Sequence, residues 1–214
     1  YKASLRVYKR RAFPIEWART QLNLGNAYVD RIDGERSANV EQAIAHLTAA
    51  SRNYQRDRFP VEWATLQLML GKAYDRRITG SRLANVEEAI ARSKAALEVR
   101  TREALPVAWA EIQLNLGAFY RDRLAGERLE NLEQAILHCE AALQVFTQKE
   151  FSDRWATIQN NLALVYADRI AGERLANLEQ AISCHEASLY VYTRGAFPME
   201  WARAQLNLSG IYKA

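Results

Sequence analysis

Two adjacent pairs of histidine and cysteine are the clearest candidates for metal chemistry in this sequence. His138 is followed by Cys139, and Cys184 is followed by His185. Imidazole and thiolate groups are common ligands of tetrahedral zinc sites. Adjacent residues on a helix point about 100° apart, however, so these pairs are poorly placed to converge on one ion. We therefore expect the four side chains to pack in the protein interior, and we expect no metal and no other cofactor.

Arginine recurs at two positions of the chain at a constant interval, which suggests either anion binding or a structural role. The first interpretation is a ladder of anion sites. The second, which we favour, is that the arginines bond carbonyl groups at helix ends and pair with glutamates of the Glu41 type. The two sets are Arg31, Arg77, Arg123 and Arg169, and Arg36, Arg82, Arg128 and Arg174.

No spaced motif of a known enzyme class is present. The sequence has no glycine-rich phosphate loop, no His-Glu-x-x-His and no nucleophile elbow. Its acidic residues belong to recurring positions near predicted helix ends. We therefore expect a protein that is not an enzyme.

The elements that must position these residues are revealed by tryptophan. Trp17, Trp63, Trp109, Trp155 and Trp201 are each separated by 46 residues, so the 214 residues hold between four and five copies of one unit. The whole chain is predicted to be a single repeat array. Its parts are a partial repeat 1–12, the repeats 13–58, 59–104, 105–150 and 151–196, and a partial repeat 197–214.

Each repeat is predicted to contain two helices, which we call A and B. In helix A, Trp17, Gln21, Leu24 and Tyr28 share one stripe of a 3.6-residue helix. A proline three residues before the tryptophan suits the first helical turn, and in the fourth copy Ser152-Asp153 is expected to cap the helix instead.

The sequence also predicts where helix A ends and helix B begins. Gly34 and its equivalents are predicted to end helix A in a left-handed conformation. Asn39, followed by Gln42, is predicted to open helix B with a capping box, in which the asparagine accepts a backbone N–H. Ala43 and Ala50 on the buried face of helix B would let the helices approach closely.

These patterns predict an all-α fold. We expect about ten helices, in the order B, four A–B pairs and a final A, forming a right-handed α-solenoid of antiparallel helix pairs. In this superhelix the A helices lie on the inner side of the curve and the B helices on the outer side.

Composition limits the class of partner and the compartment. The net charge is +4 and is dispersed, so a nucleic-acid partner is not expected. No run of 18 apolar residues suggests a membrane partner. Two cysteines in a chain of this length favour a reducing compartment, and we expect a cytoplasmic protein. Because both ends fall inside a repeat, we expect the chain to be a segment of a longer protein.

The string Leu24-Gly25-x-x-Tyr28, followed by Ala43 and Ala50, resembles the tetratricopeptide repeat. That family has Trp, Leu-Gly and Tyr in its first helix and small residues in its second. Its usual period is about 34 residues. Here helix A begins about one turn earlier and the A–B connection is longer.

Two branches of that family are most similar. The string NNLALVY at 160–166 resembles kinesin-light-chain-like repeats. The pattern "EWA…Q…NLG…Y…DR…GER…N…EQAI" resembles bacterial arrays, notably cyanobacterial ones, which are often linked to a CHAT caspase-like peptidase domain. The resemblance implies an interaction or regulatory array.

In tetratricopeptide arrays, ligands usually bind the concave groove lined by the A helices. Asparagine recurs at the position of Asn23 in four of five copies, and Met69 interrupts the row. In related arrays the matching asparagine pairs with the backbone of a bound peptide. The alternative is that these asparagines are solvated or bond across adjacent A helices. The predicted groove residues are Arg19, Asn23, Asn26, Asp30, Lys72, Arg76, Asn115, Asp122, Asn161, Asp168, Arg203 and Asn207.

Three hypotheses for function follow. The leading one is a non-enzymatic scaffold that binds a peptide or a protein partner on the concave helix-A surface. The alternative is a sensor, regulatory or oligomerisation arm of a larger effector protein, such as a CHAT-type peptidase. The third is end-to-end self-association of the array. Leu22, Leu68, Leu114 and Leu206 adjoin the groove and are expected to pack between neighbouring A helices.

Overall fold

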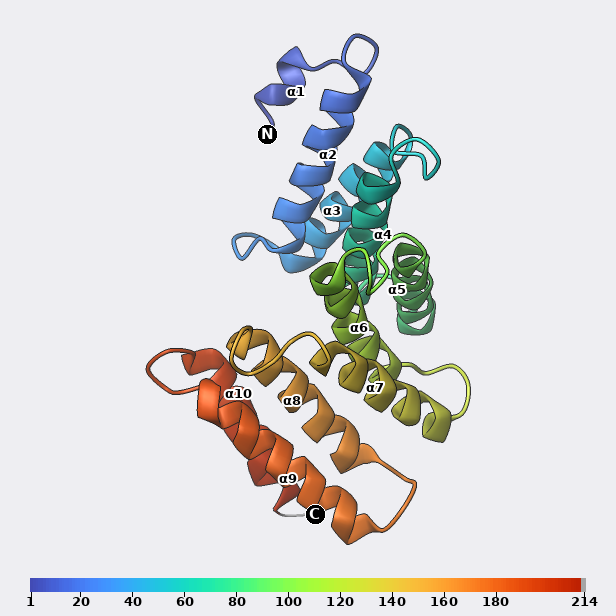
Figure 1. Cartoon of the computed structure of the whole chain (residues 1–214). Helices are drawn as coiled ribbons and strands as arrows, with labels where there is room; N and C mark the ends of the chain where they lie inside the picture. Colours follow the sequence, from blue (N-terminus) through green and yellow to red (C-terminus); the bar gives the residue numbers. More distant parts are fainter. Residues whose placement is uncertain (213–214) are drawn as a thin grey trace. The chain divides into compact units, whose positions relative to one another are not determined.

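The computed structural model describes residues 1–212, which contain ten α-helices and no strand (Figure 1). This confirms the predicted fold class and helix order. Helices α2, α4, α6, α8 and α10 are the A helices, and the odd-numbered helices are the B helices. Their bounds are α1 Ser4–Val7, α2 Pro14–Val29, α3 Arg36–Ser51, α4 Pro60–Asp75, α5 Arg82–Leu97, α6 Pro106–Arg121, α7 Arg128–Leu143, α8 Ser152–Asp168, α9 Arg174–Val191 and α10 Pro198–Ile211.

The chain divides into two compact units, one covering Tyr1–Leu105 and the other beginning at Pro106. In the first unit α2 packs on α3 and α4 packs on α5, and the two A helices, α2 and α4, also contact each other. In the second unit α6 packs on α7 and α8 on α9, while α6 contacts α8 and α8 contacts α10. Among the described residues no contact joins α3 to α5 or α7 to α9. Within each unit the A helices are therefore closer together than the B helices.

The A helices begin where the prolines predict. Pro14, Pro60 and Pro198 occupy the first helical turn, and α6 begins at Pro106. The prediction for the fourth copy was wrong in one respect. Ser152 is itself the first residue of α8, and the capping position is Phe151, which makes no side-chain cap hydrogen bond.

The A–B turn differs from the prediction at its glycine. Gly34 has a φ of 85°, which confirms its left-handed conformation, and Gly80, Gly126 and Gly172 have φ between 74° and 76°. Helix α2, however, already ends at Val29. The glycine therefore lies inside the turn and does not end the helix. A left-handed residue reverses the chain equally well in either place, so the residue type alone does not locate the helix end.

The prediction of an asparagine capping box was also wrong. Helix α3 begins at Arg36, so Asn39 lies inside its first turn, and the capping position is Glu35. Asn39 is buried and donates from Nδ2 to the carbonyl of Asp33 at 2.9 Å. Its equivalents do the same to the carbonyls of Thr79, Ala125 and Ala171, at 3.0, 2.8 and 2.8 Å. The asparagine is thus a donor that holds the A–B turn to helix B.

Small residues allow the A and B helices to pack closely, as the sequence predicts. Ala43, Leu47 and Ala50 of α3 are fully buried. A Cβ added to Gly25 of α2 would lie 2.5 Å from Cγ of Leu47, so this contact requires a glycine. The position of Leu47 is fully buried in each of the four full repeats, although the other three hold Ser93, Cys139 and His185 there.

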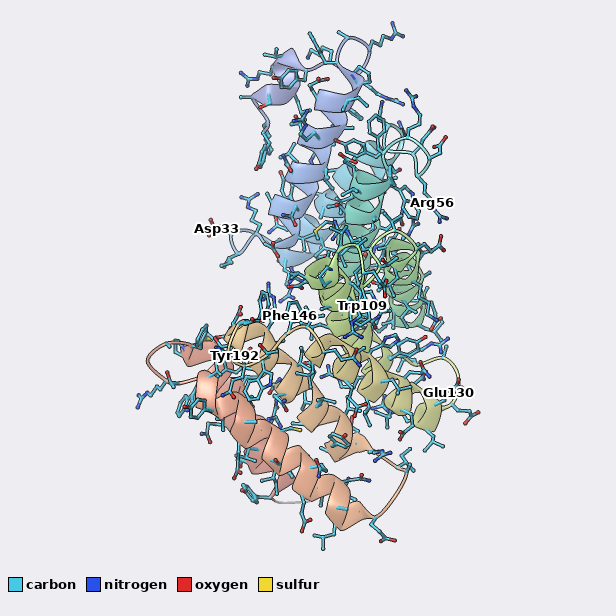
Figure 2. The ribbon with its side chains drawn as sticks, in the orientation of Figure 1. Asp33, Arg56, Trp109, Glu130, Phe146 and Tyr192 are labelled. Carbon is cyan, nitrogen blue, oxygen red and sulfur yellow. The ribbon has the colours of Figure 1, made fainter. Side chains whose placement is uncertain are left out.

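A pair of aromatic rings closes the turn between each B helix and the next A helix in four of five copies. The rings meet edge to face, with centroids 5.2–5.8 Å apart. Phe146 and Tyr192, which lie just after the ends of α7 and α9, each provide the first ring of such a pair (Figure 2). The pairs are Tyr8–Phe13, Tyr54–Phe59, Phe146–Phe151 and Tyr192–Phe197.

The remaining copy has Arg100 and Leu105 in place of the two rings. Arg100 is half-buried and donates from Nη2 to Oγ1 of Thr65, while its Nε has no hydrogen-bond partner in the structure. Burial lowers the pKa of Arg100. This turn therefore contains a partly desolvated charge where its equivalents contain an aromatic contact.

Candidate partner-binding surface on the A helices

Nine of the predicted groove residues lie on the surface of the A helices, and the other three, Asp30, Arg76 and Asp122, directly follow the ends of α2, α4 and α6. Each of the twelve is exposed or half-buried, and none belongs to the core. Their positions alternate along each helix with fully buried ones, such as Ala18 and Ala64, each of which follows a tryptophan. The chain therefore presents this set of side chains to solvent within each of its two units.

Asparagines at the Asn23 position make no hydrogen bond within the described part of the chain. This holds for Asn23 and, in the second unit, for Asn115, Asn161 and Asn207. Asn115 has a buried Nδ2 without a partner. These amides do not bond across adjacent A helices, which removes one half of the structural alternative; the other half, solvation, fits Asn23, which is exposed. The Nδ2 of Asn115 is therefore an unsatisfied donor in the structure.

Met69, which interrupts the asparagine row, has a structural explanation. Its half-buried side chain packs against the core cluster that includes Leu66 and Leu70. The second copy therefore replaces a polar surface group by an apolar contact at this position.

The three aspartates of the predicted set are instead paired with arginines. Arg76 donates to Oδ1 of Asp30 at 3.0 Å. Asp168 accepts from Nη2 of Arg128 at 2.9 Å. Asp122 accepts from Nε of Arg121 at 2.8 Å. The structure thus separates the prediction into asparagines without internal partners and acidic residues that pair with arginines.

A cavity of about 530 Å³ lies in the second unit, beside the last two A helices. Its lining includes Asp168 of α8 and Asn207 of α10 from the predicted groove, Leu206 of the leucine row, and Leu164 and Gly210 at the position of Asn26 in their repeats. This volume is in the range of ligand pockets. The remaining lining residues are Arg121, Ala167, Arg174, Leu178 and Ile211.

The leucine row packs as expected in the first three copies. Leu22, Leu68 and Leu114 are at most 9% exposed. The fourth copy has Asn160 at this position, and it is 4% exposed with no partner for its Oδ1. Leu206 of α10 differs, because 73% of it is exposed and it lines the cavity in the second unit.

Recurrent arginines confirm the structural interpretation. Arg77 forms two hydrogen bonds to the carboxylate of Glu41, at 2.7 and 3.1 Å, and Arg169 does the same with Glu133 at 2.8 and 3.0 Å. The Arg77 guanidinium lowers the pKa of Glu41, and the carboxylate raises the pKa of Arg77. Each pair joins the A–B turn of one repeat to helix B of the preceding repeat.

The second arginine set caps the A helices. Arg82, Arg128 and Arg174 donate from Nη1 to the carbonyls of Asp75, Arg121 and Ala167. These carbonyls lie at or next to the ends of α4, α6 and α8 and have no partner inside the helix.

The histidines and cysteines are packed between helices. His46 and His138 lie with Nδ1 2.5 and 2.6 Å from the amide oxygens of Gln21 and Gln113, respectively. Burial raises the pKa of Cys139 to about 12 and that of Cys184 to about 11, so both remain thiols at neutral pH. In the described residues no three His, Cys, Asp or Glu side chains are grouped as metal ligands would be.

Sequence reasoning missed a row of exposed aliphatic residues in the A–B turns. Ile32 is 95% exposed, and Ile78, Leu124 and Ile170 are 63–67% exposed. The signal was present in the sequence, because one large aliphatic residue recurs in a turn that is otherwise mostly polar.

Two comparisons with known proteins return no match. No family model matches the chain, and no curated protein matches it in sequence. No helix among residues 1–212 is both long enough and apolar enough to cross a membrane.

Proposed function

We propose that this chain is a tetratricopeptide-like array, with an elongated 46-residue repeat, that binds an extended peptide or protein segment on its A-helix surface. The observation that carries the proposal is the recurring asparagine without internal hydrogen bonds, at a surface where Asp30, Asp122 and Asp168 pair with arginines. An amide side chain offers both a donor and an acceptor, so it can pair with a peptide backbone of any sequence.

The residues around the asparagines favour a peptide as the bound ligand over a small charged molecule. Asp168 and the neighbouring acidic residues pair with arginines, which leaves a surface of mixed and balanced charge. The cavity at α8 and α10 adds apolar contacts from Leu164 and Leu206 beside Asn207. A row of amides beside an apolar cavity suits a segment that combines backbone pairing with one inserted aliphatic or aromatic side chain.

A displayed peptide library selected on the chain tests this proposal. We expect a peptide to be enriched, and we expect the double variant Asn115→Ala and Asn161→Ala to bind it about 10- to 100-fold more weakly, because two side-chain hydrogen bonds are lost. Gln134→Ala with Gln180→Ala is the matched control. These amides lie in the same two repeats, on the B helices α7 and α9, and should not affect binding.

Circular dichroism should show the same helical content for both double variants. Equal weakening by the two double variants would contradict an A-helix site, and so would a selection that enriches no peptide.

A further inference from the structure

A cavity of about 330 Å³ lies at the turn between α2 and α3, and three arginines line it. Arg31 comes from the turn, Arg36 from the first turn of α3, and Arg76 follows the end of α4. The lining also includes Tyr28 and Asp30. Figure 2 labels Asp33, which lies on the same turn. This cavity is separate from the asparagine row described above.

Arg36 differs from its equivalents in having no internal acceptor. Arg82, Arg128 and Arg174 each donate to a carbonyl at the end of their own A helix. The equivalent carbonyl in the first copy belongs to Val29, and it accepts from Nη1 of Arg76 at 2.6 Å. Arg36 is exposed and makes no hydrogen bond or ion pair in the described residues.

Arg36 lacks its acceptor because the second copy has a different residue at one position of the repeat. Three copies have an aspartate at this position, namely Asp30, Asp122 and Asp168, whereas the second copy has Arg76. Arg76 reaches back to the first copy, where it bonds both the carbonyl of Val29 and the carboxylate of Asp30. The exchange therefore adds a guanidinium to the cavity and also takes the acceptor that Arg36 would otherwise use.

The cavity carries an excess of positive charge. Asp30 lines it, but its Oδ1 already accepts from Arg76 at 3.0 Å. The guanidinium of Arg31 lies over the ring of Tyr28, with its Cζ 5.8 Å from the ring centroid. Guanidinium groups bind phosphate through paired N–H donors with matching geometry. A volume of about 330 Å³ accommodates a phosphate group together with a small organic substituent.

We propose that this cavity is a binding site for the phosphate group of a small anion, either inorganic phosphate or a small phosphomonoester, and that Arg36 provides its main donor groups. The site belongs to the first A–B turn and has no counterpart where Arg82, Arg128 and Arg174 cap their own helices. It is a function in addition to peptide binding and does not depend on it.

Calorimetric titration of the chain at constant ionic strength tests the site. One arm uses inorganic phosphate and the other uses ribose 5-phosphate. We expect saturable binding of one anion per chain in at least one arm. A tighter fit of ribose 5-phosphate would assign the site to phosphomonoesters, and equal or weaker binding would assign it to the free ion. Absence of saturable heat in both arms would overturn the proposal.

Two variants assign the binding to Arg36. We expect Arg36→Gln to weaken binding at least about tenfold, since a charged donor pair is lost. Arg128→Gln is the matched control, because it removes the same charge from the equivalent position in the other unit, and it should leave the affinity unchanged. An unchanged affinity in Arg36→Gln, or an equal loss in Arg128→Gln, would show that general charge and not this cavity attracts phosphate.

Arg76→Asp restores the residue that the other copies have at this position. We expect it to abolish phosphate binding, since it removes one guanidinium and leaves the Val29 carbonyl open to Arg36. Circular dichroism should show the same helical content as the parent chain. Phosphate binding that persists undiminished in a folded Arg76→Asp variant would contradict the mechanism by which Arg36 is released.

Discussion

Acid should destabilise the second unit through a single buried histidine. His185 of α9 is fully buried, and neither of its ring nitrogens has a hydrogen-bond partner in the structure. Burial lowers the pKa of His185 from its ordinary value of 6.5 to about 4. The protonated imidazole is disfavoured there because a charge in an apolar interior loses its hydration.

The difference in pKa between the folded and unfolded chains sets the size of the effect. At pH 7.5 His185 is neutral in both states, so its titration costs nothing. As the pH falls below 6.5 the unfolded chain binds the proton first, and this proton binding favours unfolding. The free energy of unfolding should fall by about 2 kcal/mol at pH 5, and by about 3 kcal/mol below pH 4, where both states are protonated.

Two substitutions separate proton binding from the burial of a polar group. His185→Leu introduces the residue that the first copy has at this position, where Leu47 is fully buried. We expect it to raise stability by about 1 kcal/mol at pH 7.5, because two unsatisfied nitrogens are removed, and by about 3 kcal/mol at pH 5. His185→Gln keeps a polar side chain that cannot bind a proton in this range. It should lose the acid sensitivity without the gain at pH 7.5.

Urea unfolding followed by circular dichroism at pH 7.5 and pH 5 measures these values. Other groups that titrate, including His46 with its pKa lowered by burial and by Lys2, are the same in all three chains. The reasoning is refuted if both variants lose as much stability between the two pH values as the parent chain does.

Two further substitutions, each with a control variant, test the packing and the turn of the repeat. Gly25→Ala should lower the free energy of unfolding by about 1–2 kcal/mol, because overpacking against Leu47 at 2.5 Å outweighs a helix-propensity gain of at most about 1 kcal/mol. Gly210→Ala, where the added Cβ meets nothing within 4 Å, should instead leave stability unchanged or raise it, and urea unfolding of both variants decides between these outcomes. Asn131→Ala should cost about 1–3 kcal/mol in the same assay, because it leaves the Ala125 carbonyl without its 2.8 Å donor, and a loss no larger than that of exposed Asn26→Ala would contradict this role.

The repeat architecture could be predicted from sequence, but the exact helix ends could not. Tryptophan spacing and proline positions located the A helices because proline has one favourable place at a helix start. The prediction of a helix cap at Asn39 was wrong because an asparagine side chain can either accept a hydrogen bond as a helix cap or donate one to a carbonyl of the turn. The residue type alone does not distinguish these two roles. Gly34 misled for a similar reason, since a positive φ fits the turn as well as the helix end.

The sequence predicted which side chains lie on the surface, but not which of them form hydrogen bonds or ion pairs with other residues. Nine of the twelve predicted side chains lie on the A-helix surface, as helical periodicity requires, and the other three directly follow the helix ends. Which of them have partners depends on contacts between successive repeats, and those contacts cannot be found from spacing within one repeat. Arg128 with Asp168 is an example, because the two residues are 40 positions apart.

Because the repeats are regular, the hydrogen-bond partners of a residue can be compared with those of its equivalents in the other repeats. A residue whose partners differ from those of its equivalents is then a candidate for a function. A free arginine on a single domain would be an ordinary surface residue. Here three equivalents of Arg36 show which acceptor that arginine normally has, and Arg76 shows why the acceptor is taken. The same logic applies to His185, whose equivalent Leu47 shows that the position needs no polar group. A polar or charged residue retained where the fold requires none therefore indicates either a functional group or a stability cost, and phosphate titration of Arg36 and acid unfolding of His185 distinguish these two outcomes.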